Sequence, residues 1–372
     1  MRFLLIAGFP DSLLHFRGPL IQALMDCGLE VHVAAPDLPK GGELRTRLEA
    51  KGLVVHSIPL LRTGMNPVAD LKTFLALCFL ARSIRPEFVM GYTIKPVIYG
   101  SIAAWFARVP QRFALITGLG YAFQGEGRRG ALRNLVQRLY AIALQRTHKV
   151  FFQNPDDEVL FRSNGILKSS LPSVVLNGSG VDIAAFDLAP LPSKPVFLLI
   201  ARLLGDKGVR EYVQAAREIR LVRPGVKFLL VGWIDENPDA IRQSELDAWI
   251  QEGVVEFLGR MADVRPAIAK ASVYVLPSYR EGTPRTVLEA MAMGRAIITT
   301  DAPGCRETVV DGVNGLLVPV REVAPLVAAM QQLLDSPRLL SSMGQQSRRL
   351  VIEKFDVHKV NAVMLNEMGI RC

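Results

Sequence analysis

The clearest fold signal in the sequence is PVFLLIARLLGDKG at residues 195–208, together with the helical pattern that follows at residues 209–222. Its first half is a short aliphatic run, which is typical of a strand buried in a parallel sheet. Its second half is a glycine-containing turn. A strand, a turn and a helix in this order form the βα unit of doubly wound sheets, so we expect an α/β protein.

The same alternation extends outward in both directions. Strand-like runs occur at 3–7, 31–35, 54–58 and 88–92, and again at 227–231, 254–258, 273–276 and 296–299, with helical patterns between them. A chain of 372 residues is long enough for two such domains. Three prolines in LAPLPSKP favour a linker. We therefore expect domains at residues 1–187 and 196–351 with a linker at 188–195.

The charge of the chain is unevenly distributed. The net charge is +9, and residues 101–150 contain eight basic residues and one acidic residue. Such a segment suits an anionic surface, either nucleic acid or phospholipid. The apolar runs fall well short of the roughly 20 residues that a membrane-spanning helix needs. Half of the residues are hydrophobic, which excludes a disordered chain.

The four cysteines, Cys27, Cys78, Cys305 and Cys372, are far apart and form no CxxC pair. This spacing favours neither a disulfide framework nor a zinc site, and it fits a reducing cytoplasm.

The turn at 201–208 carries two cations, Arg202 and Lys207. An arginine offers a flat fork of donors and a lysine a compact charge, so the pair could converge on one diphosphate. The alternative is an ordinary solvated loop. Neither GxGxxG after a strand nor GxxxxGK[ST] occurs in the chain, which disfavours ordinary dinucleotide and P-loop sites.

A second candidate segment is EGTPRTVLEAMA at residues 281–292. We expect a helix that Thr283 caps and that has Pro284 at its first position, with free backbone N–H groups facing a ligand. Glu281 would precede this helix and Glu289 would lie about two turns inside it, so that both carboxylates could reach one polyhydroxylated ligand. The alternative is a turn residue and a solvated helix residue.

These segments together resemble the retaining glycosyltransferases of family 4. The resemblance continues in LEAMAMG (288–294), GCRE (304–307), DGVNG (311–315), NGSGVD (177–182) and FFQN (151–154), and it covers most of residues 170–320. It implies the GT-B fold, in which two Rossmann-like domains face a central cleft and the C-terminal domain holds a nucleotide sugar. It also implies that a final helix within 352–372 crosses back to the N-terminal domain.

The resemblance assigns roles to individual residues. Arg202 and Lys207 would hold the donor diphosphate, and Glu281 would meet the sugar hydroxyls; these three are the catalytic candidates. The implied substrate-binding residues are Gly282, Thr283 and Pro284 around the sugar, Glu289 at the ribose, Gly259 and Arg260 at the uracil, Gly8 beside the phosphates, and Asn177 at the domain junction.

One departure concerns the histidine that many relatives have after the fourth or fifth strand of the first domain. Residues 115–121 contain none, and we interpret His15, His32 and His56 as structural or surface residues.

The segments GLGYAF (118–123), FQNPDD (152–157) and DAPGCRE (301–307) are most like those of bacterial enzymes that transfer N-acetylgalactosamine or another hexosamine to undecaprenyl-diphosphate-linked sugars. This implies a UDP-sugar donor, a polyprenyl-diphosphate acceptor and a role in cell-surface polysaccharide or glycoprotein glycan assembly. The chain has no DxD motif, so we expect no metal and no other cofactor. We expect a cytoplasmic protein that binds the anionic inner face of the cell membrane through the basic segment 128–149.

Two other functions compete with this interpretation. A GT-B epimerase acting on UDP-N-acetylglucosamine would share the fold and the ligand but would need no acceptor. A nucleic-acid-binding protein could use the basic segment 101–150. The aromatic residues of that segment lie in apolar surroundings that do not suit base stacking, so we expect no nucleic acid partner.

Overall fold

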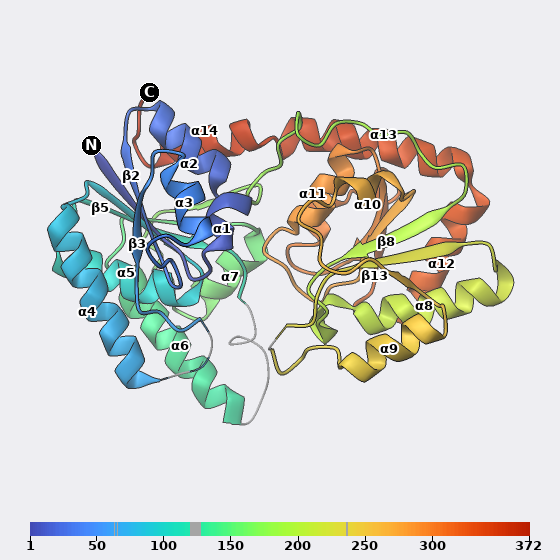
Figure 1. Cartoon of the computed structure of the whole chain (residues 1–372), viewed down its shortest axis with the longest axis horizontal. Helices are drawn as coiled ribbons and strands as arrows, with labels where there is room; N and C mark the ends of the chain where they lie inside the picture. The colour runs from blue at the N-terminus through green and yellow to red at the C-terminus, as the bar shows by residue number, and fades with distance from the viewer. Residues whose placement is uncertain (63, 65, 120–127, 236) are drawn as a thin grey trace. The chain divides into compact units, whose positions relative to one another are not determined.

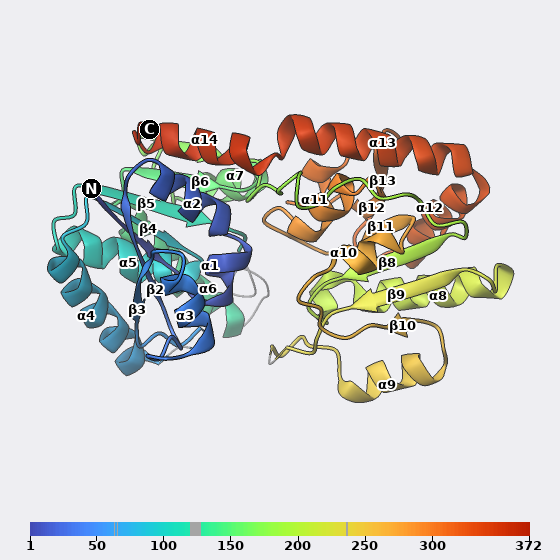
Figure 2. The same cartoon turned by 45° about the horizontal axis from the view of Figure 1, so that its top comes forward.

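The computed structural model describes residues 1–62, 64, 66–119, 128–235 and 237–372, with only the backbone of residues 128, 129, 131 and 132. These residues divide into two compact units, and each contains one β-sheet (Figures 1 and 2). The first unit consists of Met1–Ser179 together with Val360–Cys372. The second unit consists of Gly180–Lys359.

The strands of the first unit are β1 (Arg2–Ile6), β2 (Glu30–Ala35), β3 (Val54–Ser57), β4 (Phe88–Tyr92), β5 (Gln111–Ile116), β6 (Lys149–Phe152) and β7 (Ser173–Val175). They form a sheet in the order β3-β2-β1-β4-β5-β6-β7, and its described pairs are parallel. The order reverses between β1 and β4. Ligands of doubly wound sheets bind at the carboxyl ends of the strands beside such a reversal.

The helices of the first unit are α1 (Asp11–His15), α2 (Gly18–Asp26), α3 (Glu43–Glu49), α4 (Pro67–Ile84), α5 (Ile94–Phe106), α6 (Arg128–Leu144) and α7 (Pro155–Ser163), joined by most of α14 (Val357–Glu367). They cover both faces of the sheet. Leu24 of α2, Leu48 of α3 and Met364 of α14 share one core cluster. On the other face, α4 and α5 pack side by side, as do α5 and α6 (Figure 1).

The second unit contains the strands β8 (Val196–Ile200), β9 (Lys227–Val231), β10 (Glu256–Phe257), β11 (Val273–Leu276), β12 (Ala296–Thr300) and β13 (Gly315–Val318). Their order, β10-β9-β8-β11-β12-β13, is that of a Rossmann sheet, and the described pairs are again parallel. The order reverses between β8 and β11. The loop after β8, residues 201–208, is the first segment singled out in the sequence. The second one, 281–292, begins in the loop after β11, residues 277–284.

The helices of the second unit are α8 (Val209–Val222), α9 (Gln243–Gln251), α10 (Arg265–Ala269), α11 (Arg285–Ala292), α12 (Val323–Asp335) and α13 (Pro337–Lys354), with short 3₁₀ segments at Gly205–Lys207 and Arg306–Thr308. Helices α8, α9 and α12 share one core cluster, while α10 and α11 belong to a second one. Two parallel α/β sheets with helices on both faces confirm the predicted fold class.

The units divide between Ser179 and Gly180, before the proline-rich run that suggested a linker. Residues 188–195 group with the second unit, and their backbone forms hydrogen bonds with it. The Ala189 N–H donates to the Met293 carbonyl at 3.4 Å, and the Pro190 carbonyl accepts from Arg295 at 3.2 Å. At the other end of the chain, residues 352–359 also group with the second unit, and residues 360–372 group with the first.

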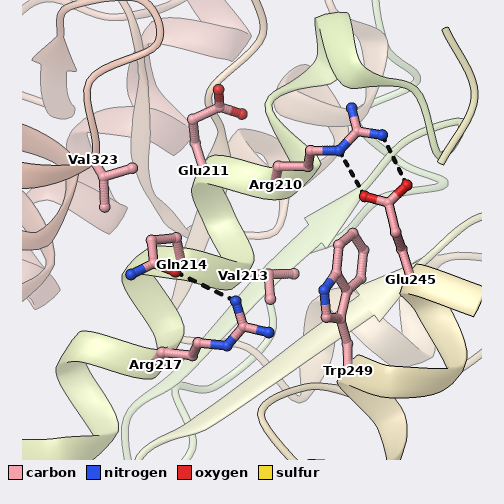
Figure 3. A pocket seen from close by; sticks show the side chains of 8 residues that line it. All are labelled: Arg210, Glu211, Val213, Gln214, Arg217, Glu245, Trp249 and Val323. Carbon is pink, nitrogen blue, oxygen red and sulfur yellow. Dashed lines mark hydrogen bonds and ion pairs between the residues drawn. The ribbon is translucent and has the colours of Figure 1, made fainter.

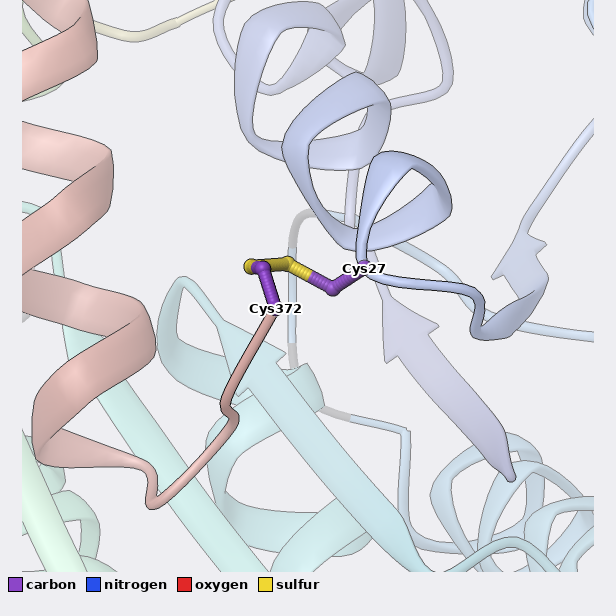
Figure 4. Close-up of a disulfide and its surroundings, with 2 residues drawn as sticks. All are labelled: Cys27 and Cys372. Carbon is purple, nitrogen blue, oxygen red and sulfur yellow. A yellow bond between two sulfur atoms is a disulfide. The ribbon is translucent and has the colours of Figure 1, made fainter.

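A disulfide joins Cys27, just after α2, to Cys372, with the two Cα atoms 4.4 Å apart (Figure 4). The inference from spacing, which did not favour disulfides, is wrong for these two cysteines. The two residues are 345 positions apart in the chain. They meet because Met364, Leu365, Met368 and Ile370 pack with α2 in the core of the first unit, so sequence spacing could not reveal the pair.

Candidate functional site

The loops after β8 and β11 are bound to each other. The Tyr279 N–H donates to the Asp206 carbonyl at 2.8 Å, and the Ser278 hydroxyl donates to the same oxygen at 3.1 Å. Gly208 has a φ of +69°, and a Cβ at this position would overlap the Pro277 carbonyl. Only glycine allows this approach, so the cation loop is held against the carboxylate loop.

Lys207 and Glu281, which lie on these two loops, form an ion pair. The Lys207 Nζ is 2.6 Å from the Glu281 Oε1, and the side chains are 13% and 18% exposed. Burial alone would lower the pKa of Lys207, but the negative charges of Glu281 and Asp206 outweigh it and raise that pKa. Lys207 is therefore an ammonium at neutral pH, as an anion-binding group must be.

Arg202 lies close enough to contribute to the same positive field. Its charge acts on the pKa of Lys207, in the lowering direction. The Arg202 Nη1 itself is 2.9 Å from the Asp235 Oδ2, on the segment that follows β9. Both cations that the sequence singled out are thus paired with carboxylates, and an incoming anion would exchange partners with those carboxylates.

Two acidic residues of this site were missed in the sequence. Asp235 pairs with Arg202, and Asp239 holds the cation loop through its backbone carbonyl, which accepts from the Gly205 N–H at 2.8 Å, and its Oδ2, which accepts from the Asp206 N–H at 2.7 Å. The segment after β9 lies beside that after β8 because these strands are neighbours. The signal that could have found them is an acidic loop after the strand next to β8.

The loop from Glu281 to Pro284 takes a different form from the one expected. The helix begins at Arg285, and Pro284 occupies the N-cap position with extended backbone and no side-chain cap. The predicted Thr283 cap and first-turn proline are therefore wrong. Proline has no acceptor in its side chain. The backbone carbonyl of Pro284 instead accepts hydrogen bonds from the N–H groups of Val287 and Leu288.

Glycine is also required in the loop after β12, which lies against this loop. The Glu281 N–H donates to the Pro303 carbonyl at 2.9 Å. Gly304 has a φ of +81°, and a Cβ there would overlap the Glu281 carbonyl. Contacts with the backbone of residues 303–304 therefore fix the position of the Glu281 backbone, from which its side chain extends.

Glu289 lies one turn into α11, rather than two turns, and is buried. Burial raises the pKa of its carboxyl, while Arg285, whose Nε is 2.9 Å from the Glu289 Oε1, acts in the opposite direction. A buried carboxylate with a single nearby cation is a good acceptor for ligand hydroxyls.

The other residues predicted to bind substrate lie on segments outside these two loops. Gly259 follows β10, and its carbonyl accepts from the Gly232 N–H at 3.0 Å. The exposed Arg260 has its guanidinium 4.8 Å from the centre of the Trp233 ring. Gly8 and Asn177 belong to the first unit.

Within the first unit, Gly8 follows β1 at the point where the strand order reverses. A Cβ on it would come within 2.8 Å of the Thr93 hydroxyl after β4. Asn177 is exposed after β7. His32 and His56 stack on β2 and β3, with ring nitrogens 3.0 Å apart, far along the sheet order from β5. Residues 120–123 of the GLGYAF segment lie outside the described residues.

A separate hollow of about 320 Å³ opens between α8 and α9 (Figure 3). Its two arginines are already paired with carboxylates: Arg210 bonds Glu245 at 2.8 and 3.0 Å, and Arg217 lies 2.7 Å from Glu252. The lining includes neither Arg202 nor Lys207. This hollow is not the predicted site.

In the described parts of the chain, no helix is both long and apolar enough to cross a membrane. The same residues contain no group of three or more His, Cys, Asp or Glu side chains placed to hold a metal ion.

Comparisons with known proteins bear on the family of the chain and on its fold. Residues 4–154 match the family model "Glycosyl transferase 4-like", and residues 194–336 match "Glycosyl transferases group 1". The chain is 30% identical over 351 residues, 90% of each chain, to the N,N'-diacetylbacillosaminyl-diphospho-undecaprenol alpha-1,3-N-acetylgalactosaminyltransferase of Campylobacter jejuni.

Two further proteins are similar over most of their length. The UDP-Gal:alpha-D-GlcNAc-diphosphoundecaprenol alpha-1,3-galactosyltransferase of Escherichia coli is 26% identical over 81% of this chain and 80% of its own. The solved structure of sucrose-phosphate synthase from Thermosynechococcus elongatus superposes with a TM-score of 0.82 at 18% identity, covering 99% of this chain and 98% of the other.

Proposed function

Since this chain belongs to family 4 of the glycosyltransferases, the group 1 enzymes of GT-B fold, we propose that it transfers a sugar from a UDP-sugar to a polyprenyl-diphosphate-linked glycan. The transferred sugar is an N-acetylhexosamine, and its anomeric configuration is retained. The product serves the assembly of a bacterial cell-surface polysaccharide or glycoprotein glycan. The lipid-linked acceptors in the names of the Campylobacter and Escherichia relatives support this acceptor class.

The observation that carries the proposal is the ion pair between Lys207 and Glu281 at the strand-order reversal of the second sheet. A cation for phosphate and a carboxylate for sugar hydroxyls lie within one hydrogen bond of each other. A nucleotide sugar has the same two chemistries on adjacent groups, a diphosphate and a hydroxylated ring. The pair therefore matches the reacting end of that donor.

Each predicted residue takes a part of the donor. Arg202 and Lys207 bind the diphosphate and stabilise the charge that develops as it departs. Glu281 accepts from sugar hydroxyls, helped by backbone groups of Gly282, Thr283 and Pro284. Glu289 accepts from the ribose. The remaining assignments are Gly259 and Arg260 at the uracil, and Gly8 and Asn177 as substrate-binding residues of the first unit.

The reaction balances without a protein nucleophile. The bond between the anomeric carbon and the diphosphate oxygen breaks, and the acceptor hydroxyl oxygen forms the new bond to that carbon. The hydroxyl proton passes to the departing diphosphate, which leaves as UDP. Two cations neutralise this leaving group, so the proposal needs no metal.

The acceptor determines where such an enzyme works. A polyprenyl diphosphate keeps its head group at the bilayer surface. We therefore place the enzyme at the cytoplasmic face of the cell membrane as a peripheral protein.

A donor and acceptor screen tests the proposal. Purified protein is incubated with a panel of UDP-sugars, with and without a short polyprenyl-diphosphate-linked acceptor, and the products are separated by mass. We expect a glycosylated lipid with one N-acetylhexosamine donor and release of UDP. Turnover of UDP-N-acetylglucosamine without acceptor, giving an epimerised sugar, would replace the transferase by an epimerase.

A further inference from the structure

The outward side of α4 carries large apolar side chains that no described residue of the first unit covers. Val68, Leu71, Leu75 and Phe79 are all exposed, and Phe79 is 77% exposed. Their spacing of three and four residues places them in one stripe along the helix. The inward side of the same helix is also apolar and packs in the core. A helix that is apolar on both sides still lacks a partner for one of them.

The stripe continues across the ends of the two neighbouring helices. The ring of Phe74 on α4 meets the ring of Phe106 at the end of α5, edge to face, with centroids 5.8 Å apart. Trp105 and Phe106 are themselves exposed. The guanidinium of Arg146, just after α6, lies 4.2 Å from the centre of the Trp105 ring.

We call this surface the α4–α6 face. Its exposed apolar side chains are Val68, Leu71, Leu75 and Phe79 of α4, Trp105 and Phe106 of α5, and Leu135 and Ile142 of α6. Its exposed basic side chains are Lys72, Arg82, Arg85, Arg108, Arg138 and Arg146.

The exposed charged side chains that the structure describes on this face are all basic. Between residues 67 and 149, the acidic side chains that the structure describes are Asp70 and Glu87. Asp70 is already paired with Lys95 at 2.8 Å, and Glu87 accepts from the backbone N–H of Arg2. The α4–α6 face therefore presents exposed apolar and basic groups without a matching set of free carboxylates.

We propose that the α4–α6 face docks on an anionic lipid bilayer, with its apolar side chains in the head-group region and its basic side chains at the lipid phosphates. This combination is what an interfacial membrane surface requires. A protein partner would require complementary carboxylates on itself and offers no general reason for a purely basic rim. The proposal rests on the proposed function for its biological reason, a lipid-linked acceptor.

The face differs from the docking segment expected from the sequence, residues 128–149. Lys149 is bound to Glu367 at 2.7 Å, and Tyr140 and Leu144 are buried in the core. The side chains of Arg128 and Arg129 lie outside the described residues. Of the described basic side chains in the expected segment, Arg138 and Arg146 belong to the α4–α6 face, and α4 adds apolar side chains that the expectation did not include.

Vesicle flotation tests the proposal with the full-length protein. The vesicles are phosphatidylcholine alone or phosphatidylcholine with about one-third phosphatidylglycerol. The apolar variant is Leu71→Gln/Leu75→Gln/Phe79→Gln, and the charge variant is Arg82→Gln/Arg138→Gln. The control, Leu221→Gln/Val222→Gln, changes two exposed apolar residues of α8 in the second unit.

We expect wild type and the control to bind the anionic vesicles alike, and the apolar variant to lose at least about 30-fold in partitioning. The charge variant should bind less at low salt, and that difference should vanish at high salt. The proposal would be overturned if the apolar variant bound the anionic vesicles as tightly as wild type, or if wild type did not bind them. A wild-type dimer that the apolar variant converts to monomer would overturn it too, since a second copy would then cover the face.

Tryptophans introduced in a Trp105→Phe background, which removes the native tryptophan of the face, provide a second readout that does not depend on the triple variant folding. In that background, Phe79→Trp should show emission quenched by brominated lipids in the bilayer, whereas Leu221→Trp should not. Equal quenching of the two would contradict docking through α4.

Sugar transfer is also measured with the acceptor dispersed in detergent, where no membrane is needed. This measurement distinguishes a failure of the docking proposal from a failure of the proposed function. If the function is wrong, no variant transfers sugar but the vesicle results stand. If the face is wrong, transfer persists and the vesicle results fail.

Discussion

The Lys207 Nζ lies 2.6 Å from the Glu281 Oε1, so the phosphate-binding cation and the sugar-binding carboxylate of the proposed site neutralise each other in the free protein. A diphosphate that binds Lys207 releases Glu281 from this pair. The carboxylate is then available to sugar hydroxyls. In the proposed function, the binding of the donor diphosphate would therefore be coupled through Lys207 to the release of Glu281 for the sugar.

The first prediction concerns the two cations. Arg202→Ala and Lys207→Ala should each lower turnover at least about 30-fold, because a charge-assisted hydrogen bond contributes about 1.5–3 kcal/mol. Steady-state turnover with donor and acceptor measures the effect. Arg217→Ala is the control, since Arg217 pairs with Glu252 on the surface of the same unit. Turnover near that of wild type in both site variants, with folding intact, would remove the diphosphate assignment.

The second prediction concerns metal dependence. Turnover should survive excess EDTA, because Arg202 and Lys207 supply the positive charge that a metal ion would bring to a diphosphate. The same assay is run with EDTA and after adding back Mg²⁺ or Mn²⁺. Activity lost with EDTA and restored only by a divalent cation would contradict this role.

Much of this site could be predicted from local sequence, and the limits have a physical cause. The strand at 196–200, Arg202 and Lys207 lie in one continuous segment, so their order alone predicts the loop after β8. The pairing of Arg202 with Asp235 depends instead on β9 lying beside β8. Strand order is a property of the whole sheet, which a local pattern does not contain.

The start of α11 and the disulfide were missed for related reasons. Threonine followed by proline is a common helix start, but at 283–284 the chain is held extended up to Pro284. Cys27 and Cys372 are brought together only by the packing of the chain's last residues on α2.

The third prediction follows from the disulfide. Unfolded, unreduced protein should contain two reactive thiols, Cys78 and Cys305, and reduction should reveal all four. In the folded protein both thiols should react slowly, because burial raises their pKa, that of Cys305 to about 12. Thiol titration measures these numbers. Four thiols before reduction would show that the bond is absent.

The fourth prediction concerns acid stability. Burial, with the charges of His32 and Arg45, lowers the pKa of His56 from 6.5 to about 4. Between these values the unfolded chain binds a proton that the folded protein does not, so stability falls as pH falls from 6.5 to 4, by at most about 3 kcal/mol. In His56→Gln this loss should shrink, as seen in the pH dependence of Tm. Identical pH profiles would exclude His56 as the cause.

The most direct test of the account is the affinity of the protein for UDP compared with uridine, measured by calorimetry. The two ligands differ only by the diphosphate. Wild type, and the control Arg210→Met/Arg217→Met beside the hollow of Figure 3, should bind UDP at least about tenfold more tightly than uridine. In Arg202→Met/Lys207→Met the two affinities should become nearly equal. An unchanged preference for UDP in that double variant would contradict the account.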